Sequence, residues 1–277
     1  MRILPKIALA TVVFVLVAFA DDASPYKQTM NVVYVERDGV GLLMDVFAPL
    51  QPTDPGKGLG IVCVISGAWK SERFILDAHT NFGIFDILCR RGYTVFAVRP
   101  GSLALYTANQ MLENINTGIR YVKAHAAEYG VDPERMGLIG TSAGGHLTLL
   151  AATRMAPGDA NAEEPLDHFS TQVRAVAVFC PPTDFLDWNG KKYGLDLMQG
   201  QLIFRDGFAN KSNRDIEDAA KDISPVYRVH PGMPPFLLVH GDADSVVPFH
   251  QSEKFVEAVQ QAGGSAELIV KKGGDHS

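Results

Sequence analysis

Short, continuous apolar runs alternate with stretches of helical periodicity along most of this chain. Continuous apolar runs are typical of strands buried on both faces of a parallel sheet. Parallel strands need crossover connections, which are usually helices, so the two kinds of segment then alternate in sequence. The pattern therefore predicts an α/β fold with a mainly parallel central sheet and helices on both faces. We predict strands at residues 60–65, 93–98, 136–140, 173–179, 235–240 and 266–270, and helices at residues 81–91, 108–129, 143–155 and 251–262.

Two segments of alternating polarity precede this pattern. Residues 31–36 and 42–47 flank Asp38-Gly39, a dipeptide typical of tight turns, so we expect an N-terminal β-hairpin. No repeat or low-complexity tract divides the rest, and 277 residues that are 47% hydrophobic can build one large core. We therefore predict a single domain over residues 21–277.

Residues 184–231 interrupt the alternation of strands and helices. This segment is polar and rich in Gly, Asp, Asn and Lys, yet it carries aromatic residues at Phe185, Trp188, Tyr193, Phe204 and Phe208. A long insertion in a compact domain is often a lid or a substrate-contacting flap. A surface excursion whose aromatic side chains pack on the sheet explains the segment equally well.

The N-terminus has the pattern of a secretory signal. Basic residues Arg2 and Lys6 precede an apolar run over residues 7–20, and Ala18 and Ala20 form an A-x-A cleavage site. The alternative is a retained membrane anchor, but 14 apolar residues are fewer than the roughly 20 that a spanning helix needs. We predict a signal peptide over residues 1–20 and a secreted or periplasmic protein without stable membrane insertion.

Charge and cysteine content narrow the classes of partner. Removal of residues 1–20 takes away two positive charges and moves the formal net charge from −6 to −8, so nucleic acid is an unsuitable partner. Three cysteines, an odd number, lie in apolar runs at Cys63, Cys89 and Cys180. We interpret them as small buried side chains rather than a disulfide framework.

A nucleophile is predicted at Ser142. Residues 140–144 read GTSAG, which fits G-x-S-x-G, and they lie between a predicted strand and a predicted helix. In such a turn the serine hydroxyl is exposed at the end of the strand, and the glycines leave room for the surrounding backbone. Because a predicted strand precedes this pentapeptide and a predicted helix follows it, the motif strongly indicates a serine nucleophile.

A serine nucleophile needs a histidine base and a group that orients this base. His276 follows the last predicted strand and is our candidate base. Asp244 follows the strand at 235–240 and is our candidate acid, while Asp242 and Asp275 remain competitors. The order Ser, Asp, His along the chain is the expected one for a nucleophile on a strand-to-helix turn. The other histidines, including His146 and His240, are interpreted as hydrogen-bonded structural or surface residues.

Backbone N–H groups must bind the oxyanion that forms during acyl transfer. One donor is expected from Ala143, the residue after the nucleophile. A second is expected from residues 66–69, which follow the strand at 60–65 and whose small members let the backbone approach a substrate closely. Trp69 in this loop either covers the acyl pocket and binds substrate or is a core aromatic.

At these positions the chain resembles esterases and lipases of the α/β-hydrolase fold, near the hormone-sensitive-lipase-like enzymes and the bacterial acetylxylan and feruloyl esterases. The resemblance extends over residues 31–276. It rests on residues 44–49 (MDVFAP), 132–136 (DPERM), 140–147 (GTSAGGHL) and 234–244 (PPFLLVHGDAD).

The resemblance implies roles for several residues. The acid in these enzymes is the second Asp of the H-G-x-x-D pattern, which supports Asp244. Their H-G-G-A-W loop aligns with residues 65–69, which implies oxyanion donors at Gly67 and Ala68. This chain departs from the loop pattern at Ile65 and Ser66. Relatives also continue beyond the base into a closing helix, so we expect the sequence to be truncated at its C-terminus.

These observations together predict a secreted serine esterase that needs no cofactor and no metal. The resemblance implies short acyl or aryl esters as substrates, including small-molecule and carbohydrate-linked ones. An exported serine peptidase of the prolyl-oligopeptidase kind is an alternative, but such enzymes carry an aromatic residue after the nucleophile and a propeller domain. A non-catalytic relative of the same fold is the other alternative. The sequence does not indicate the oligomeric state.

Overall fold

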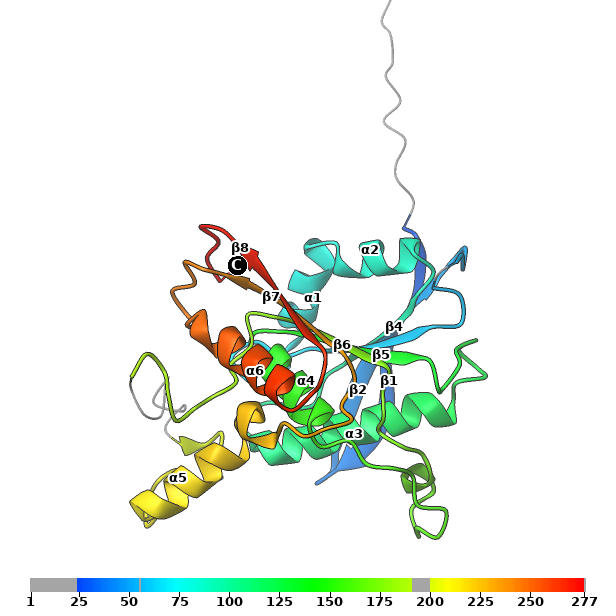
Figure 1. Cartoon of the computed structure of the whole chain (residues 1–277). Helices are drawn as coiled ribbons and strands as arrows, with labels where there is room; N and C mark the ends of the chain where they lie inside the picture. The colour runs from blue at the N-terminus through cyan, green and yellow to red at the C-terminus, as the bar shows by residue number, and fades with distance from the viewer. Residues whose placement is uncertain (1–23, 55, 191–199, 277) are drawn as a thin grey trace, which may run out of the picture.

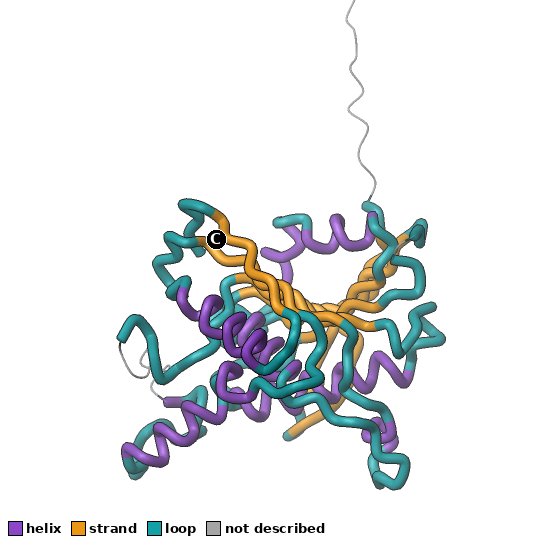
Figure 2. Tube along the Cα trace, viewed as in Figure 1, coloured by secondary structure: helices purple, strands orange, loops and turns teal. Residues whose placement is uncertain are grey.

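The computed structural model describes residues 24–54, 56–190 and 200–276. Their strands form one sheet in the order β1-β2-β4-β3-β5-β6-β7-β8, with helices on both sides of it (Figures 1 and 2). The strands from β4 to β8 in this order pair in parallel, whereas β2 is antiparallel to both of its neighbours. The predicted α/β fold with a mainly parallel sheet is confirmed, and the predicted signal peptide lies outside the described residues.

The bounds of the elements agree with most of the predicted segments. The strands are β1 (Tyr26–Arg37), β2 (Val40–Pro49), β3 (Gly60–Val64), β4 (Thr94–Val98), β5 (Met136–Thr141), β6 (Ala175–Phe179), β7 (Phe236–Gly241) and β8 (Ala266–Lys271). The α-helices are α1 (Arg73–Asn81), α2 (Ile84–Arg90), α3 (Ala108–Ala124), α4 (Ala143–Ala152), α5 (Asn213–Asp222) and α6 (His250–Gln261), and short 3₁₀ turns lie at Pro165–His168 and Pro225–Arg228.

The predicted N-terminal hairpin is confirmed. Strands β1 and β2 pair up to Arg37 and Val40, which leaves Asp38 and Gly39 as a two-residue turn. Both turn residues have positive φ, at 54° and 73°. Such a turn matches the right-handed twist of the two strands, and Asp and Gly tolerate its backbone conformation.

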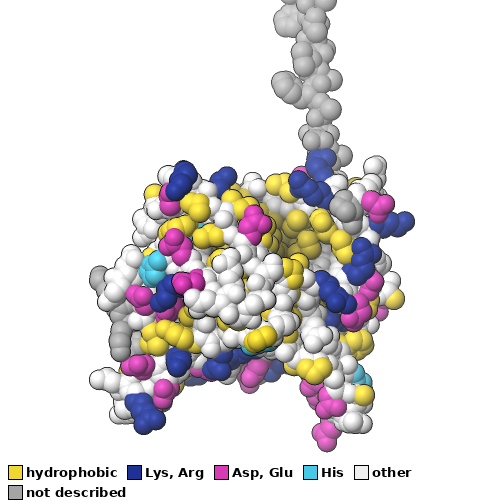
Figure 3. Space-filling model, in the orientation of Figure 1, with side chains coloured by type: hydrophobic (Ala, Val, Ile, Leu, Met, Phe, Trp, Pro, Cys, Tyr) yellow, Lys and Arg dark blue, Asp and Glu magenta, His cyan; other side chains and the backbone are white. Residues whose placement is uncertain are grey.

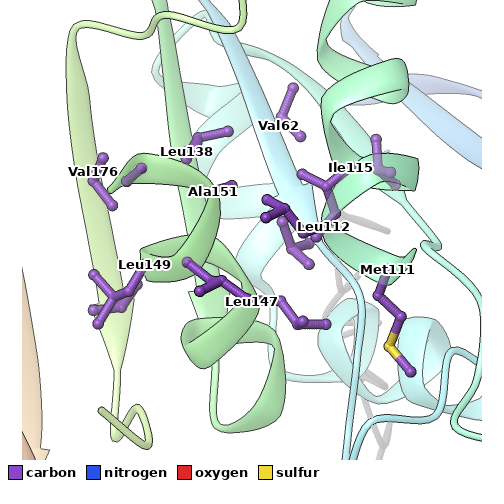
Figure 4. Packing of buried hydrophobic residues seen from close by; sticks show 14 of the residues in the cluster. Val62, Met111, Leu112, Ile115, Leu138, Leu147, Leu149, Ala151 and Val176 are labelled. Atoms are coloured by element: carbon purple, nitrogen blue, oxygen red, sulfur yellow. The ribbon is translucent and has the colours of Figure 1, made fainter. Parts of the chain in front are cut away.

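The main core lies between the sheet and the helices α3, α4 and α6, and Figure 4 shows the part of it at α3 and α4. All five residues of the central strand β4 are buried, as expected for a parallel strand covered on both sides. The apolar side chains in this layer include Val62, Leu138 and Val176 from the strands, Met111 and Ile115 from α3, and Leu147 and Leu149 from α4.

A smaller cluster lies on the other face, where α1 and α2 pack. The Phe47 ring on β2 stacks on the Phe85 ring on α2 with centroids 3.9 Å apart. Beside α2 the sheet borders a cleft of about 670 Å³, which is lined by apolar residues of β5, β6 and β7 such as Ile139, Ala177 and Leu237. Figure 3 shows hydrophobic side chains gathered in a hollow of this face.

Two helices were not predicted from the sequence. The predicted helix at 81–91 corresponds to α2, while α1 just before it lacks a side-chain N-cap and is only nine residues long. Helix α5 lies in the 184–231 insertion, and Ala220 is its one buried residue. Its start was nevertheless visible in the sequence, because Ser212 and Asp215 form a capping box.

Within the described ranges, none of the helices combines the length and the apolar character that a membrane-spanning segment requires.

Candidate active site

Ser142 lies at the turn between β5 and α4, in a backbone conformation that serine rarely adopts. Its φ and ψ are 55° and −123°, so the turn is strained. A Cβ at Gly140 would lie 2.4 Å from the carbonyl oxygen of Gly144, and a Cβ at Gly144 would lie 2.5 Å from the carbonyl oxygen of Val64. Both glycines are therefore required by the close approach of backbone around Ser142.

The side chains of Ser142, His276 and Asp244 form a continuous hydrogen-bond chain. The Ser142 Oγ lies 2.9 Å from His276 Nε2, and His276 Nδ1 lies 2.8 Å from Asp244 Oδ2. A carboxylate accepts hydrogen bonds, so Nδ1 carries the ring proton and Nε2 is left to accept the serine proton. The three residues come from the loops after β5, β7 and β8, which all lie at the carboxyl edge of the sheet.

The Asp244 carboxylate is buried, and both of its oxygens accept hydrogen bonds. Its side chain is 0% exposed, and its Oδ1 accepts the backbone N–H groups of Val246 and Val247, each at 2.8 Å. A buried carboxylate with several donors is held in one orientation and stays a good partner for a cationic imidazole.

The two competing acids have other partners. Asp242 accepts the N–H of Gly273 and pairs with Lys272, and these bonds lower the pKa of its carboxyl. Asp275 accepts the N–H and the hydroxyl of Ser245 and the backbone N–H of His276. Asp275 thus ties the loop that carries the base to the loop that carries Asp244, while the His276 ring bonds to Asp244.

A second histidine, His240, contacts the same carboxylate. Its Nε2 lies 3.1 Å from Asp244 Oδ2 and 3.0 Å from the carbonyl oxygen of Val247. Because a carbonyl can only accept, Nε2 carries the proton, and Nδ1 accepts from the Ser252 hydroxyl at 2.7 Å. Burial lowers the pKa of His240, which keeps it a neutral donor. The sequence indicated a hydrogen-bonded histidine here but not its contact with Asp244.

The predicted oxyanion loop packs against the start of α4. The N–H of Gly144 donates to the carbonyl of Ser66 at 3.0 Å, and the N–H of Gly67 donates to the carbonyl of Lys70 at 2.9 Å. The N–H predicted as a donor at Gly67 therefore has an acceptor within its own loop in this structure. The N–H of Ala68 has no backbone acceptor among the described residues, and Ala143 is the first residue of α4, where N–H groups are unpaired within the helix.

Trp69 is 2% exposed, and its indole N–H donates to His146 Nδ1 at 2.9 Å. This placement is the one expected of a core aromatic, the second of the two roles considered for this residue. Ile65 is likewise buried, and the buried hydroxyl of Ser66 has no hydrogen-bond partner among the described residues.

Cys180 lies beside the hydrogen-bond chain. Its Sγ lies 3.7 Å from the carbonyl oxygen of His276, and burial raises the pKa of its thiol to about 12. Cys180, Asp244 and His276 together offer one sulfur, one oxygen and one nitrogen within 4.8 Å of one another. These are atoms that a soft divalent cation can bind, but the carboxylate and the imidazole are already paired with each other.

Comparisons with known proteins agree with this geometry. The chain is 29% identical over 197 residues to a probable carboxylic ester hydrolase, LipM, from Mycobacterium tuberculosis, a match that covers 70% of this chain and 43% of the relative. The chain spans about half the length of the curated relatives it matches.

Solved structures with the same fold include esterases. A truncated carbohydrate esterase from gut microbiota superposes with a TM-score of 0.76 at 25% identity and covers 92% of this chain and 90% of its own. Esterase 2 of Thermogutta terrifontis with bound propionate gives a TM-score of 0.66 at 26% identity and covers 91% and 85%. The resemblance to esterases of the α/β-hydrolase fold is therefore confirmed.

The BD-FAE family model matches residues 44–259, which include Ser142, Asp244 and the predicted oxyanion loop. With most of its length matched in this way, the chain belongs to the BD-FAE family.

Proposed function

We propose that this protein is a serine esterase that hydrolyses carboxylic esters through an acyl-enzyme. The hydrogen-bond chain from Ser142 through His276 to Asp244 carries this proposal. In the first step, the Ser142 oxygen attacks the ester carbonyl while His276 Nε2 takes its proton. The carbonyl electrons move to the oxygen, where the N–H groups of Ala68 and Ala143 stabilise the negative charge.

The tetrahedral intermediate then collapses to the acyl-enzyme. The bond to the alcohol oxygen breaks, and the protonated His276 donates its proton to this leaving group. In the second half of the reaction, His276 takes a proton from water, the water oxygen attacks the acyl carbonyl, and Ser142 leaves with the proton returned. Asp244 holds the imidazole in the required tautomer and stabilises its charge in both halves.

We further propose short acyl or aryl esters as substrates, with carbohydrate-linked esters among them. Support comes from the related structures, because one is a carbohydrate esterase and another holds propionate. A third structure of this group holds butyrate. The basic and apolar N-terminal segment supports export of the protein, so that its substrates lie outside the cytoplasm.

Turnover of p-nitrophenyl acetate and butyrate by the wild type and by Ser142→Ala tests the reaction. We expect hydrolysis by the wild type and a loss of activity of at least about 10³-fold in the variant. A fluorophosphonate probe is expected to label the wild type and not the variant. Equal rates for the two proteins would refute the mechanism, and turnover of a dipeptide amide in preference to the esters would favour the peptidase alternative.

Acetylated xylan and a feruloylated oligosaccharide test the substrate class. Release of acetate or ferulate at rates comparable with the p-nitrophenyl esters supports carbohydrate-linked substrates. Hydrolysis of the small esters alone restricts the proposal to small-molecule esters. Measurement of the protein in culture medium, in periplasmic extract and in cytoplasm tests its export.

A further inference from the structure

A buried histidine outside the hydrogen-bond chain connects three parts of the active-site region. His146 lies on α4 one turn after Ser142 and is 0% exposed. Its Nδ1 lies 2.9 Å from the indole nitrogen of Trp69 in the oxyanion loop. Its Nε2 lies 2.7 Å from the carbonyl oxygen of Ile223, at the C-terminal end of α5.

The two partners determine the protonation state of His146. An indole N–H can only donate, so Nδ1 must be unprotonated. A carbonyl can only accept, so Nε2 must carry the proton. The ring therefore acts as a neutral relay that accepts from Trp69 and donates to Ile223, and protonation of Nδ1 would break the bond to Trp69.

Trp69, which donates to His146, lies in a loop segment with a strained backbone. Ala68 and Trp69 both have left-handed φ, at 47° and 56°, a conformation that is unfavourable for non-glycine residues and persists only where neighbours enforce it. The Trp69 carbonyl accepts the N–H of Leu103 at 2.8 Å, and its indole bonds to His146. The His146 bond is thus one of the contacts that hold the loop, and with it the Ala68 N–H, in position.

Ile223, which accepts from His146, lies in the part of the 184–231 insertion that is anchored to the rest of the domain. Next to Ile223, Asp222 pairs with Arg154 at 3.0 Å and accepts from Asn109 Nδ2 at 2.9 Å. Most of α5 beyond this end is exposed, and in Figure 1 the helix projects from the body of the domain. The insertion therefore meets the oxyanion loop through the carbonyl of Ile223 and the His146 ring, and also through the Phe185 ring, whose centroid lies 5.9 Å from that of Trp69 and 5.0 Å from that of His146.

We propose that His146 is a positioning residue that couples the geometry of the oxyanion loop to the docked end of α5. The role rests on the proposed esterase function, because the loop supplies a donor to the oxyanion of that reaction. A shift of α5 would move the Ile223 carbonyl, tilt or release the His146 ring, and weaken the bond that holds Trp69. A substrate that contacts the insertion can in this way influence the stabilisation of the transition state.

The Trp69→Phe substitution tests the bond to the loop, since it keeps an aromatic ring but removes the N–H. We expect kcat to fall about tenfold with KM within about twofold, because a donor displaced by a fraction of an ångström is weakened in the transition state rather than in the ground state. The affinity for a boronic acid inhibitor, whose adduct with Ser142 resembles the tetrahedral intermediate, should fall by a similar factor.

Thr171→Val is the matched control. The Thr171 side chain is buried and accepts the N–H of Ala156 at 2.8 Å, so its loss also leaves one partner unpaired, but at a site with no link to the loop. We expect a comparable fall in Tm with kcat and inhibitor affinity unchanged. Equal effects of the two substitutions on kcat would mean that Trp69 contributes to stability alone and would overturn the proposal.

Asp222→Ala tests the coupling to the insertion without touching the active site. It removes the carboxylate that pairs with Arg154 and Arg228 and accepts from Asn109, while the Asp222 backbone carbonyl still accepts from Arg154. We expect it to lower kcat severalfold by itself and by less than about twofold in the Trp69→Phe background, because both changes break the same connection. The coupling would be overturned if the double variant lost as much kcat as the product of the two single losses. A kcat unchanged by Asp222→Ala alone would also overturn it.

Amide hydrogen exchange of residues 65–72 separates failure of this inference from failure of the proposed function. Trp69→Phe and Asp222→Ala should both increase exchange in this segment, whereas Thr171→Val should not. Faster exchange in a protein whose wild type hydrolyses no ester would disprove the esterase function and leave the mechanical connection intact. Unchanged exchange in an active enzyme would disprove the connection alone.

Discussion

The Asp244→Asn substitution gives the sharpest test of how this site works. Asparagine keeps one oxygen, which can still accept the N–H groups of Val246 and Val247 as Oδ1 does now. Its NH₂ group must then occupy the position of Oδ2, where it faces His240 Nε2 and His276 Nδ1. His240 cannot change its tautomer freely, because Nε2 also donates to the carbonyl of Val247.

The consequence falls on His276. To accept from the new NH₂ group, His276 Nδ1 must give up its proton, and the ring proton then sits on Nε2, where it can no longer take the proton of Ser142. A change of tautomer of this kind lowers kcat by about 10⁴-fold in serine hydrolases, which corresponds to ~5 kcal/mol of transition-state stabilisation. The contact of two donors, His240 Nε2–H and the NH₂ group, adds about 1–3 kcal/mol of destabilisation to the fold.

Steady-state hydrolysis of p-nitrophenyl butyrate measures the first effect, and urea unfolding measures the second. Asp242→Asn is the control, because Asp242 lies at the same loop but bonds to Gly273 and Lys272; we expect its kcat to stay within about threefold of the wild type. A loss below tenfold for Asp244→Asn, or a larger loss for Asp242→Asn, would refute the assignment of the acid and the tautomer argument.

Three further predictions concern stability and reactivity. Gly140→Ala should lower the free energy of unfolding by about 3 kcal/mol or prevent folding, since its Cβ would lie 2.4 Å from two oxygen atoms; a urea midpoint like that of the wild type would contradict this. Burial raises the pKa of the thiols of Cys63, Cys89 and Cys180 to about 12, so a disulfide reagent at pH 8 should react with none of them in the folded protein and with all three after unfolding; rapid reaction before unfolding would show that they are accessible. Burial also lowers the pKa of His146 from 6.5 to about 4. As the pH falls, the unfolded chain therefore binds a proton at this histidine before the folded chain does. About 3 kcal/mol of the free energy of unfolding should be present above pH 6.5 and lost as the pH falls to 4. Unfolding of His146→Phe across this range should show a shallower pH dependence, and an equal slope would contradict the burial of a neutral ring.

Much of the fold could be predicted because its signals are local. A strand such as β4, buried along its whole length, is apolar at every position after Thr94, and an amphipathic helix such as α3 has to repeat with the helical period. The strained turn at Ser142 is also a local feature, since the glycines on either side are needed wherever this turn occurs. Helix α5 was not predicted from periodicity because almost none of it is buried.

The choice among similar residues came from the tertiary structure. The sequence alone determined the alternation of strands and helices, the turn at Ser142 and a small set of candidate acids and bases. It did not decide that the His276 ring bonds to Asp244 rather than to Asp242, that His240 shares this carboxylate, or that the N–H of Gly67 is already used in its own loop. Ser142 and His276 are 134 residues apart along the chain and 2.9 Å apart in the fold. Which groups meet across such a separation in sequence depends on the register and twist of the sheet and on competition among neighbouring donors and acceptors. A local sequence pattern contains no information about these.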